Sequence, residues 1–191
     1  MSTFASMSRP ARKDVVQNRT ALLHAAREVL AEQGLEAPLD LIAERAGVGR
    51  ATLYRHFADR TELVLAVLID GVEDLHRRTV EQGDAPEVFF WFLDELAALL
   101  IRNAGLSGVL RTVRSPDALT PLRSKLAEAG AGPLARAQAA GMVRKNLGPM
   151  DMRLIATLLA SGFQNADAAE REAVSRRTRA IILDGIRARP Q

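Results

Sequence analysis

The sequence contains no cysteine, which excludes disulfide bonds and thiolate metal sites. Its longest apolar stretch, around residues 88–101, is interrupted by Asp94 and Glu95, so we expect no membrane span and no membrane partner. No signal peptide, nucleophile elbow or phosphate-binding loop is recognisable either. From these absences we expect a cytoplasmic protein that is not an enzyme and has no catalytic residues.

Histidine is also scarce, and this argues against a metal centre. Glu73 and His76 form a Glu-x-x-His pair of the kind that di-iron helical bundles use. Such a bundle needs a second pair, whereas the other histidines, His24 and His56, have no glutamate at the matching position. A surface pair is the better interpretation, and we expect neither a metal nor a cofactor.

Strict alternation of polar and apolar residues, which is typical of strands, is rare, whereas Ala, Leu, Glu and Arg are abundant. With 191 residues, 48% of them hydrophobic, the chain can build one compact body with a small appended domain. We therefore expect an all-α protein. Apolar spacing and turn residues predict helices at about 15–33, 59–81, 88–103, 106–113, 121–129, 134–145, 149–165 and 170–187.

Residues 39–57 contain two short amphipathic segments around a glycine turn. The first segment carries an apolar stripe formed by Leu39, Ile42, Ala43 and Ala46. Gly47 then supplies a residue that tolerates positive φ. In the second segment Leu53 and Phe57 share one helical face, whereas Arg55 points roughly the opposite way. This pattern predicts a helix-turn-helix whose second helix fits the major groove of B-DNA.

The outer side of this second helix holds the residues expected to contact DNA. Ala51, Thr52 and Arg55 form its outer face, and Tyr54 and His56 lie on its flanks, within reach of the sugar-phosphate walls of a groove. Taken alone, each of them is more simply a solvated or half-buried side chain. Their occurrence together, beside a glycine turn and a two-residue apolar anchor, favours DNA reading.

Basic residues also gather at the N-terminus. Residues 1–20 carry Arg9, Arg12, Lys13 and Arg19 against Asp14 alone. Such tails follow phosphates or a minor groove in DNA-binding proteins. A disordered segment that only improves solubility is an equally good interpretation. We expect residues 1–14 to form a disordered basic arm.

The helix-turn-helix segment resembles the TetR family of transcriptional regulators. The resemblance is carried by Ile42-Ala43, Ala46-Gly47-Val48 and Thr52-Leu53-Tyr54-Arg55-His56-Phe57, and it is extended by Asp59-Arg60-Thr61-Glu62-Leu63. It is close over about residues 18–70 and only architectural beyond them.

Three positions depart from the family pattern. Arg60 replaces the commoner lysine, Pro38 stands where a capping Thr or Ser is usual, and Gly49 stands where Ser is usual. We expect Pro38 to occupy the first position of a helix and Gly49 to serve as an N-cap, because both residues are acceptable there. A serine hydroxyl for a DNA phosphate would then be missing at position 49.

The resemblance implies a helix-turn-helix domain at residues 15–60 and a helical effector-binding and dimerisation domain at residues 61–191. It also implies a transcriptional regulator, most often a repressor, that binds a palindromic double-stranded operator as a homodimer and leaves it when a small-molecule effector binds. The expected DNA-binding residues are Arg50, Ala51, Thr52, Tyr54, Arg55, His56 and Arg60. The alternative is a helical dimer of the same fold that binds other proteins, or that binds DNA without specificity as an architectural protein.

The larger domain is expected to hold an effector pocket and a dimer interface. Four consecutive aromatic residues, 89–92, cannot all face one direction on a helix, so some of them are expected to line a pocket. The expected pocket residues are Phe89, Trp91, Phe92, Leu96, Met142 and Phe163, with plain core packing as the alternative. The expected dimer-interface residues, which would equally suit an intramolecular core, are Leu154, Leu158, Ser161, Gly162, Ile182 and Ile186.

Overall fold

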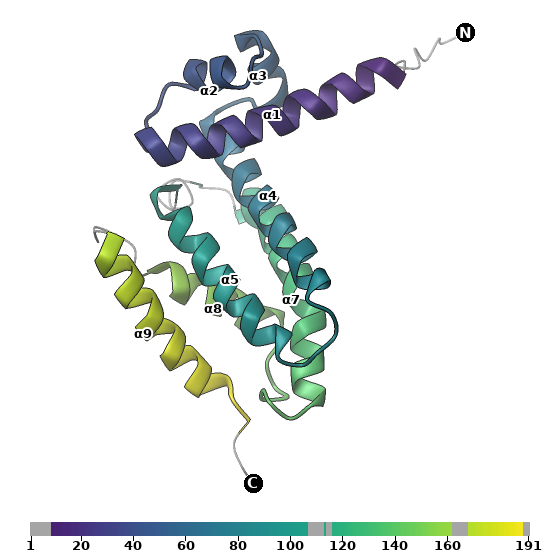
Figure 1. Cartoon of the computed structure of the whole chain (residues 1–191), viewed down its shortest axis with the longest axis vertical. Helices are drawn as coiled ribbons and strands as arrows, with labels where there is room; N and C mark the ends of the chain where they lie inside the picture. The colour runs from purple at the N-terminus through teal and green to yellow at the C-terminus, as the bar shows by residue number, and fades with distance from the viewer. Residues whose placement is uncertain (1–8, 107–112, 114–115, 162–167, 189–191) are drawn as a thin grey trace. The chain divides into compact units, whose positions relative to one another are not determined.

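The computed structural model describes residues 9–106, 113, 116–161 and 168–188 (Figure 1). Over these residues the regular elements are helices and short 3-10 turns, apart from one isolated antiparallel bridge between Val143 and Arg187. The chain forms two compact units, Met1–Val67 and Leu68–Gln191. The division falls inside helix α4 (Arg60–Glu81), seven residues beyond the boundary expected from the sequence. The all-α prediction is confirmed.

The first unit is built on helix α1 (Arg9–Gln33), which packs against α2 (Leu39–Arg45) and α3 (Arg50–His56). The buried face of α1 is apolar and consists of Leu22, Leu23, Ala26, Val29 and Leu30. The helix begins at Arg9, so residues 9–14 are helical, although the sequence analysis expected a disordered arm there. Residues 1–8 lie outside the described part of the chain.

The turn between α2 and α3 has the geometry that the glycine predicted. Gly47 has φ of +68°, and the amide of Val48 donates to the carbonyl of Ala43 at 3.0 Å, which closes the end of α2. Gly49 is the N-cap of α3, as expected. Pro38, however, is the N-cap of α2 rather than its first helical residue, because its ψ of 132° is extended. Its fixed φ suits this position, although it offers no side chain to cap the free amides.

Helix α4 begins with a capping arrangement. The amide of Glu62 donates to Oδ1 of Asp59 at 2.8 Å, and the amide of Ala58 donates to Oε2 of Glu62 at 2.7 Å. These two contacts satisfy amides at the start of the helix. The helix then continues from the first unit into the second.

The second unit surrounds helix α5 (Val88–Arg102), which contacts α7 (Thr120–Ala139), α8 (Pro149–Ser161) and α9 (Ala168–Ile186). Two 3-10 turns, η1 (Ala104–Leu106) and η2 (Pro116–Leu119), lie between α5 and α7. Phe89 and Phe92 are fully buried at the centre of the core, together with Leu96 at 1% exposure. Within the described residues, no helix has the length and apolar character that a membrane span requires. Most of the helix expected at 106–113 lies outside those residues.

Residues 120–139 form one helix, although the sequence predicted two helices separated at Gly130 and Gly132-Pro133. Gly132 has no Cβ to clash with the ring of Pro133, which removes one of the costs of a proline inside a helix. Gly130 allows a close approach, since a Cβ there would lie 3.2 Å from Met152 Cε and 3.3 Å from Phe92 Cε1. Packing against α5 and α8 therefore stabilises a helix that local propensity would interrupt.

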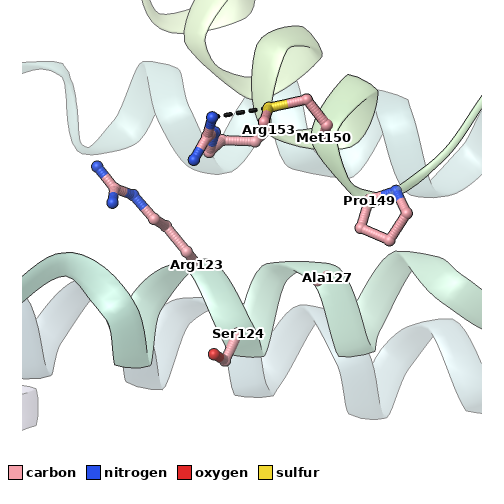
Figure 2. Close-up of a pocket in the computed structure, with 6 residues that line it drawn as sticks. All are labelled: Arg123, Ser124, Ala127, Pro149, Met150 and Arg153. Atoms are coloured by element: carbon pink, nitrogen blue, oxygen red, sulfur yellow. Dashed lines mark hydrogen bonds between the residues drawn. The ribbon is translucent and has the colours of Figure 1, made fainter. Parts of the chain in front are cut away.

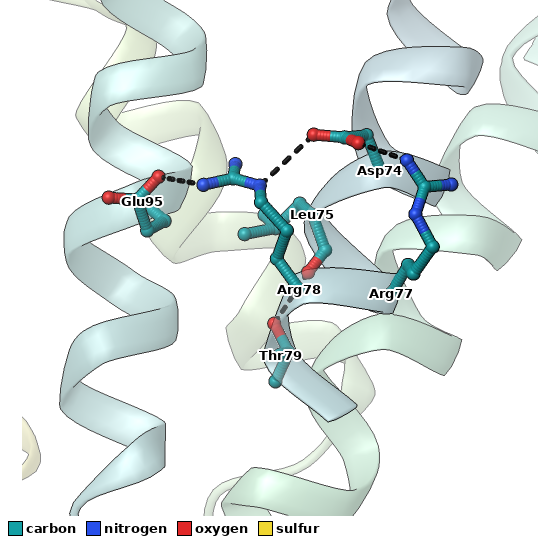
Figure 3. Close-up of polar contacts among 6 residues, drawn as sticks. All are labelled: Asp74, Leu75, Arg77, Arg78, Thr79 and Glu95. Carbon is teal, nitrogen blue, oxygen red and sulfur yellow. Dashed lines mark hydrogen bonds and ion pairs between the residues drawn. The ribbon is translucent and has the colours of Figure 1, made fainter. Parts of the chain in front are cut away.

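The two acidic residues inside the apolar helix α5 form ion pairs with two different helices. Nη1 of Arg78 on α4 lies 2.6 Å from Glu95, and its Nε lies 3.0 Å from Asp74 (Figure 3). Nη2 of Arg179 on α9 lies 2.6 Å from Asp94. Partial burial nevertheless raises the pKa of the Asp94 carboxyl, despite the nearby guanidinium. The charges that interrupt the apolar run thus connect α5 with α4 and with α9.

Candidate nucleic-acid interface

Helix α3 has one buried and one exposed face, as its sequence predicted. Leu53 and Phe57 are each 1% exposed and anchor the helix in the first unit. On the other side Ala51 and Arg55 are exposed, and Tyr54 keeps 42% of its surface accessible. The helix therefore presents polar groups to solvent from a backbone that the core holds in place.

Arg55 is held by a neighbour on its own helix. Its Nη2 donates to Oγ1 of Thr52 at 2.9 Å, one helical turn away. No carboxylate forms an ion pair with Arg55 among the residues that the structure describes. Its remaining N–H groups can therefore meet the N7 and O6 acceptors of a guanine, which a guanidinium binds in a bidentate manner.

Arg50, at the start of α3, has both an acidic and an aromatic partner. Its Nη1 lies 3.0 Å from Oδ2 of Asp40, a residue of the first turn of α2. Its guanidinium carbon also lies 5.6 Å from the centre of the Tyr54 ring, within the range of a cation–π contact. All three side chains are exposed, so the cluster is accessible to a DNA backbone.

Two other arginines of the first unit have partners within that unit. Arg60, expected to contact DNA, donates to the carbonyl oxygens of Leu35 and Ala37 and is half-buried. Arg45 forms hydrogen bonds of 3.1 and 3.2 Å with Glu32, which hold the pKa of that carboxyl below its usual value. Both guanidiniums therefore stabilise the unit in the free protein.

His56 lies on the flank of α3 in a cationic environment. Partial burial lowers the pKa of its imidazole, and the charges of Arg19 and Arg55 lower it further. Arg19 reaches this region from α1, where its guanidinium carbon lies 4.9 Å from the centre of the Phe57 ring. A DNA phosphate near His56 would have the opposite effect on the imidazole, because an anion favours the protonated form.

The sequence analysis placed Arg19 only in a basic tail and did not select Asp40. Arg19 lies on the side of α1 that faces Phe57. Its place beside α3 depends on how α1 packs against α3, which the sequence alone does not give. Asp40 precedes Arg50 by ten residues, and only the helix-turn-helix geometry brings the two side chains together. Neither contact follows from spacing along one helix.

The residues expected to line an effector pocket lie mainly within the core. Phe89, Phe92 and Leu96 are buried in it, and Trp91 and Met142 pack against it from its edge. The guanidinium of Arg78 covers the Trp91 ring at 5.8 Å. Phe163 lies outside the described residues.

A different depression occurs on the second unit, between α7 and α8 (Figure 2). Its lining residues are Arg123, Ser124, Ala127, Pro149, Met150 and Arg153. The guanidinium of Arg153 donates to the sulfur of Met150, a weak acceptor. This depression is open and small, and the sequence analysis did not select any of its residues.

The residues expected at a dimer interface fall into two groups. Leu154 and Leu158, both on α8, are each 51% exposed, and Met150, four residues before Leu154, is 57% exposed. Ile182 and Ile186, in contrast, belong to the core of the second unit, whereas the neighbouring Ile181 is 58% exposed. Gly162 and the side chain of Ser161 lie outside what the structure describes.

No group of three or more potential metal-ligating side chains occurs among the described residues. Glu73, from the Glu-x-x-His pair, lies 3.3 Å from Nζ of Lys125 and so pairs with a lysine.

The sequence and the fold were compared with known proteins. The family model described as bacterial regulatory proteins of the tetR family matches residues 22–67. A second model, described as the C-terminal domain of SbtR-like transcriptional regulators, matches residues 84–188, more than half of the chain.

Among solved structures, the chain is 33% identical to a TetR transcription regulatory protein from Mycobacterium vanbaalenii, with a TM-score of 0.60 over 93% of this chain and 99% of that one. It is 27% identical to a TetR transcriptional regulator from Streptomyces coelicolor, with a TM-score of 0.64 over 90% of this chain and 99% of that one.

Among curated proteins, the chain is 39% identical over 90 residues to the HTH-type transcriptional activator FasR of Mycolicibacterium smegmatis. That alignment covers only 41% of this chain and 41% of the activator. The two family models together, and the solved structures, match a larger part of this chain than that alignment does. On these matches, together with the helix-turn-helix geometry, the chain belongs to the TetR family of DNA-binding transcriptional regulators.

Proposed function

We propose that this regulator binds a palindromic operator as a homodimer and represses transcription until a small-molecule effector releases it. The observation that carries the proposal is the two-sided helix α3, whose buried Leu53 and Phe57 fix an outer face bearing Thr52 and Arg55. A helix fixed in this way can enter the major groove and present a guanidinium to base edges. Because operators of this kind lie on chromosomal DNA, we also infer a cytoplasmic location.

On this proposal the residues of α3 have different roles. Arg55 reads a guanine edge, and the Thr52 hydroxyl orients its guanidinium. Tyr54, Arg50 and His56 face the DNA backbone, and Ala51 allows the helix to approach the bases closely. Arg60 acts indirectly, because its hydrogen bonds to Leu35 and Ala37 hold the start of α4.

Dimerisation is supported by the exposed leucines of α8. Leu154 and Leu158 are one turn apart on the same face, and an apolar surface at this spacing suits the packing of a second helix. A two-fold axis would place two copies of α3 about one DNA turn apart, or slightly more, so that each meets a half-site of a palindrome.

Effector release requires a ligand that distinguishes two conformations. Suppose that the ligand binds more tightly to a conformation that cannot bind DNA. It then weakens operator binding by the difference between its binding free energies for the two conformations, typically about 1–3 kcal/mol. The aromatic edge around Trp91 and Met142 is our candidate site for an apolar or amphipathic effector, since both side chains are only partly buried.

The test is selection of bound genomic fragments with purified protein, followed by affinity measurements on the selected operator and on random duplex at matched salt. Arg55→Ala should cost about 1–3 kcal/mol on the operator and little on random DNA. Tyr54→Phe should weaken both, because it removes a backbone contact. If Arg55→Ala loses the same affinity on both DNAs, the alternative of a non-specific architectural protein is favoured. If the protein binds no duplex, the alternative of a dimer that binds other proteins is favoured. A promoter fusion with and without the gene then separates repression from activation.

A further inference from the structure

The pairing of Asp40 with Arg50 places a carboxylate on the helix-turn-helix surface beside the residues proposed to meet DNA. Asp40 lies in the first turn of α2, and its Oδ2 is 3.0 Å from Nη1 of Arg50, the first residue of α3. The two side chains are 57% and 67% exposed, so neither is constrained by burial. The pair connects the two helices of the motif through solvent-accessible charges.

Arg50 has a second contact that does not depend on Asp40. Its guanidinium lies over the Tyr54 ring, at 5.6 Å from the centre. The ring can keep the guanidinium on the outer side of α3 while its N–H groups exchange one anionic partner for another. A carboxylate oxygen and a phosphate oxygen accept the same charge-assisted hydrogen bonds from arginine.

We propose that Asp40 is an internal competitor for DNA phosphate, and that it limits the affinity of the regulator for DNA of any sequence. This inference rests on the proposed DNA-binding function. In the free protein Asp40 neutralises Arg50, and on DNA the guanidinium leaves the carboxylate for a phosphate while it stays on Tyr54. Asp40 is then an unpaired anion next to the DNA backbone, which opposes binding.

Asp40 should lower the affinity most for DNA complexes in which phosphate contacts supply nearly all of the binding free energy. Non-specific binding is of this kind, because it depends on the release of counterions when arginine and lysine neutralise phosphates. Two other arginines of the unit differ in this respect: Arg45 is paired with Glu28 and Glu32 on α1, and Arg60 with backbone carbonyls. At Arg50 the acidic partner belongs to the helix-turn-helix itself.

The test measures binding to a short random-sequence duplex over a salt series, and therefore needs no operator. Asp40→Asn should tighten binding about threefold to tenfold at low salt, because Arg50 no longer has to leave a carboxylate and no unpaired anion remains beside the DNA backbone. The gain should shrink as the salt concentration rises, since exposed charges are screened. Asp40→Ser, which also removes the amide, should give the same result. Asp84→Asn is the matched control, because it removes the acidic partner of Arg136 in the second unit and changes the net charge equally.

The Arg50→Ala background separates a local effect from a change in net charge. There, Asp40→Asn should give a smaller gain than in the wild-type background, because no guanidinium has to leave the carboxylate and only the repulsion between Asp40 and the DNA backbone is removed. The proposal is overturned if Asp40→Asn binds no more tightly than Asp84→Asn, or if its gain is as large without Arg50 as with it. In either of those cases the wild type still binds DNA, and the proposed function stands. If no variant binds any duplex at low salt, both proposals are wrong.

Discussion

The guanidinium of Arg60 donates a hydrogen bond of 2.8 Å to the backbone carbonyl oxygen of Ala37. A second one reaches the carbonyl of Leu35, so the first residue of α4 fixes the segment between α1 and α2. A single arginine thereby connects the start of α4 with the loop between α1 and α2. The sequence analysis expected the same residue to contact DNA.

We predict that Arg60→Ala lowers the free energy of unfolding by about 1–3 kcal/mol, because two carbonyl groups lose a charged donor. Urea denaturation followed by circular dichroism measures this loss. Arg60→Lys should recover only part of it, since an ammonium does not reproduce the planar fork of a guanidinium. The salt dependence of DNA binding should be unchanged in Arg60→Ala, and a slope smaller by about 0.9 would instead make Arg60 a phosphate contact.

Thr52→Val should weaken operator binding without weakening binding to random DNA. The substitution keeps the shape of the side chain and removes the oxygen that accepts from Nη2 of Arg55. Loss of this hydrogen bond leaves the guanidinium less well oriented, at an expected cost of about 0.5–1.5 kcal/mol on the operator. Fluorescence anisotropy with both duplexes measures the difference. In an Arg55→Ala background the valine should have no further effect, and an additive loss would show that Thr52 acts independently.

His56 should make stability depend on pH. Its pKa in the folded protein is lowered by burial and by Arg19 and Arg55, whereas in the unfolded chain it returns to about 6.5. The unfolded state therefore binds more protons, so this contribution to stability is complete above about pH 6.5 and is lost as the pH falls through the folded-state pKa. Melting temperatures measured over this range should fall less steeply for His56→Gln than for the wild type.

The control for this measurement is His24→Gln. His24 is 73% exposed on α1 and lies 3.7 Å from Glu28, away from the arginines that surround His56. The difference in pH dependence between His56→Gln and His24→Gln isolates the contribution of the surroundings of His56. Equal slopes for wild type and His56→Gln would mean that the cationic surroundings of His56 do not influence folding.

The parts of the fold that could be predicted from the sequence are those in which local pattern and tertiary packing agree. Leu53 and Phe57 were expected to anchor α3 and are both buried, and Gly47 has the positive φ that the turn required. The break expected at Gly132-Pro133 is absent, because contacts of α7 with Phe92 and Met152 on other helices decide the outcome. Such contacts are not encoded in the spacing of one helix.

The same distinction applies to the candidate site. The outer face of α3 followed from helical geometry, so Thr52, Tyr54 and Arg55 were selected correctly as exposed or half-exposed side chains. Helical geometry does not show which arginines already have a partner in the free protein, because those partners lie on other elements. Asp40 comes from α2 and Ala37 from the preceding loop. The sequence therefore predicts the exposed face of α3, but not which arginines near it are already paired.

Leu154→Glu with Leu158→Glu should convert the protein to a monomer. Both leucines are exposed on α8, and two carboxylates in an apolar helix interface would lose hydration without gaining a partner. Analytical ultracentrifugation measures the change in mass. The monomer should keep the melting temperature of its helices approximately, because neither side chain belongs to the core of the second unit.

Val80→Glu is the matched control for this double substitution, since Val80 is an equally exposed apolar residue, at 65%, on a helix not expected in the interface. It should remain dimeric. Ile182→Ala is the opposite control: its side chain is 8% exposed within the core, so it should lower stability by about 2–5 kcal/mol without changing the association state of the folded protein. A dimer that survives both glutamates would place the interface elsewhere than on the exposed face of α8. Operator binding should fall together with dimerisation, because a single α3 can read only one half-site.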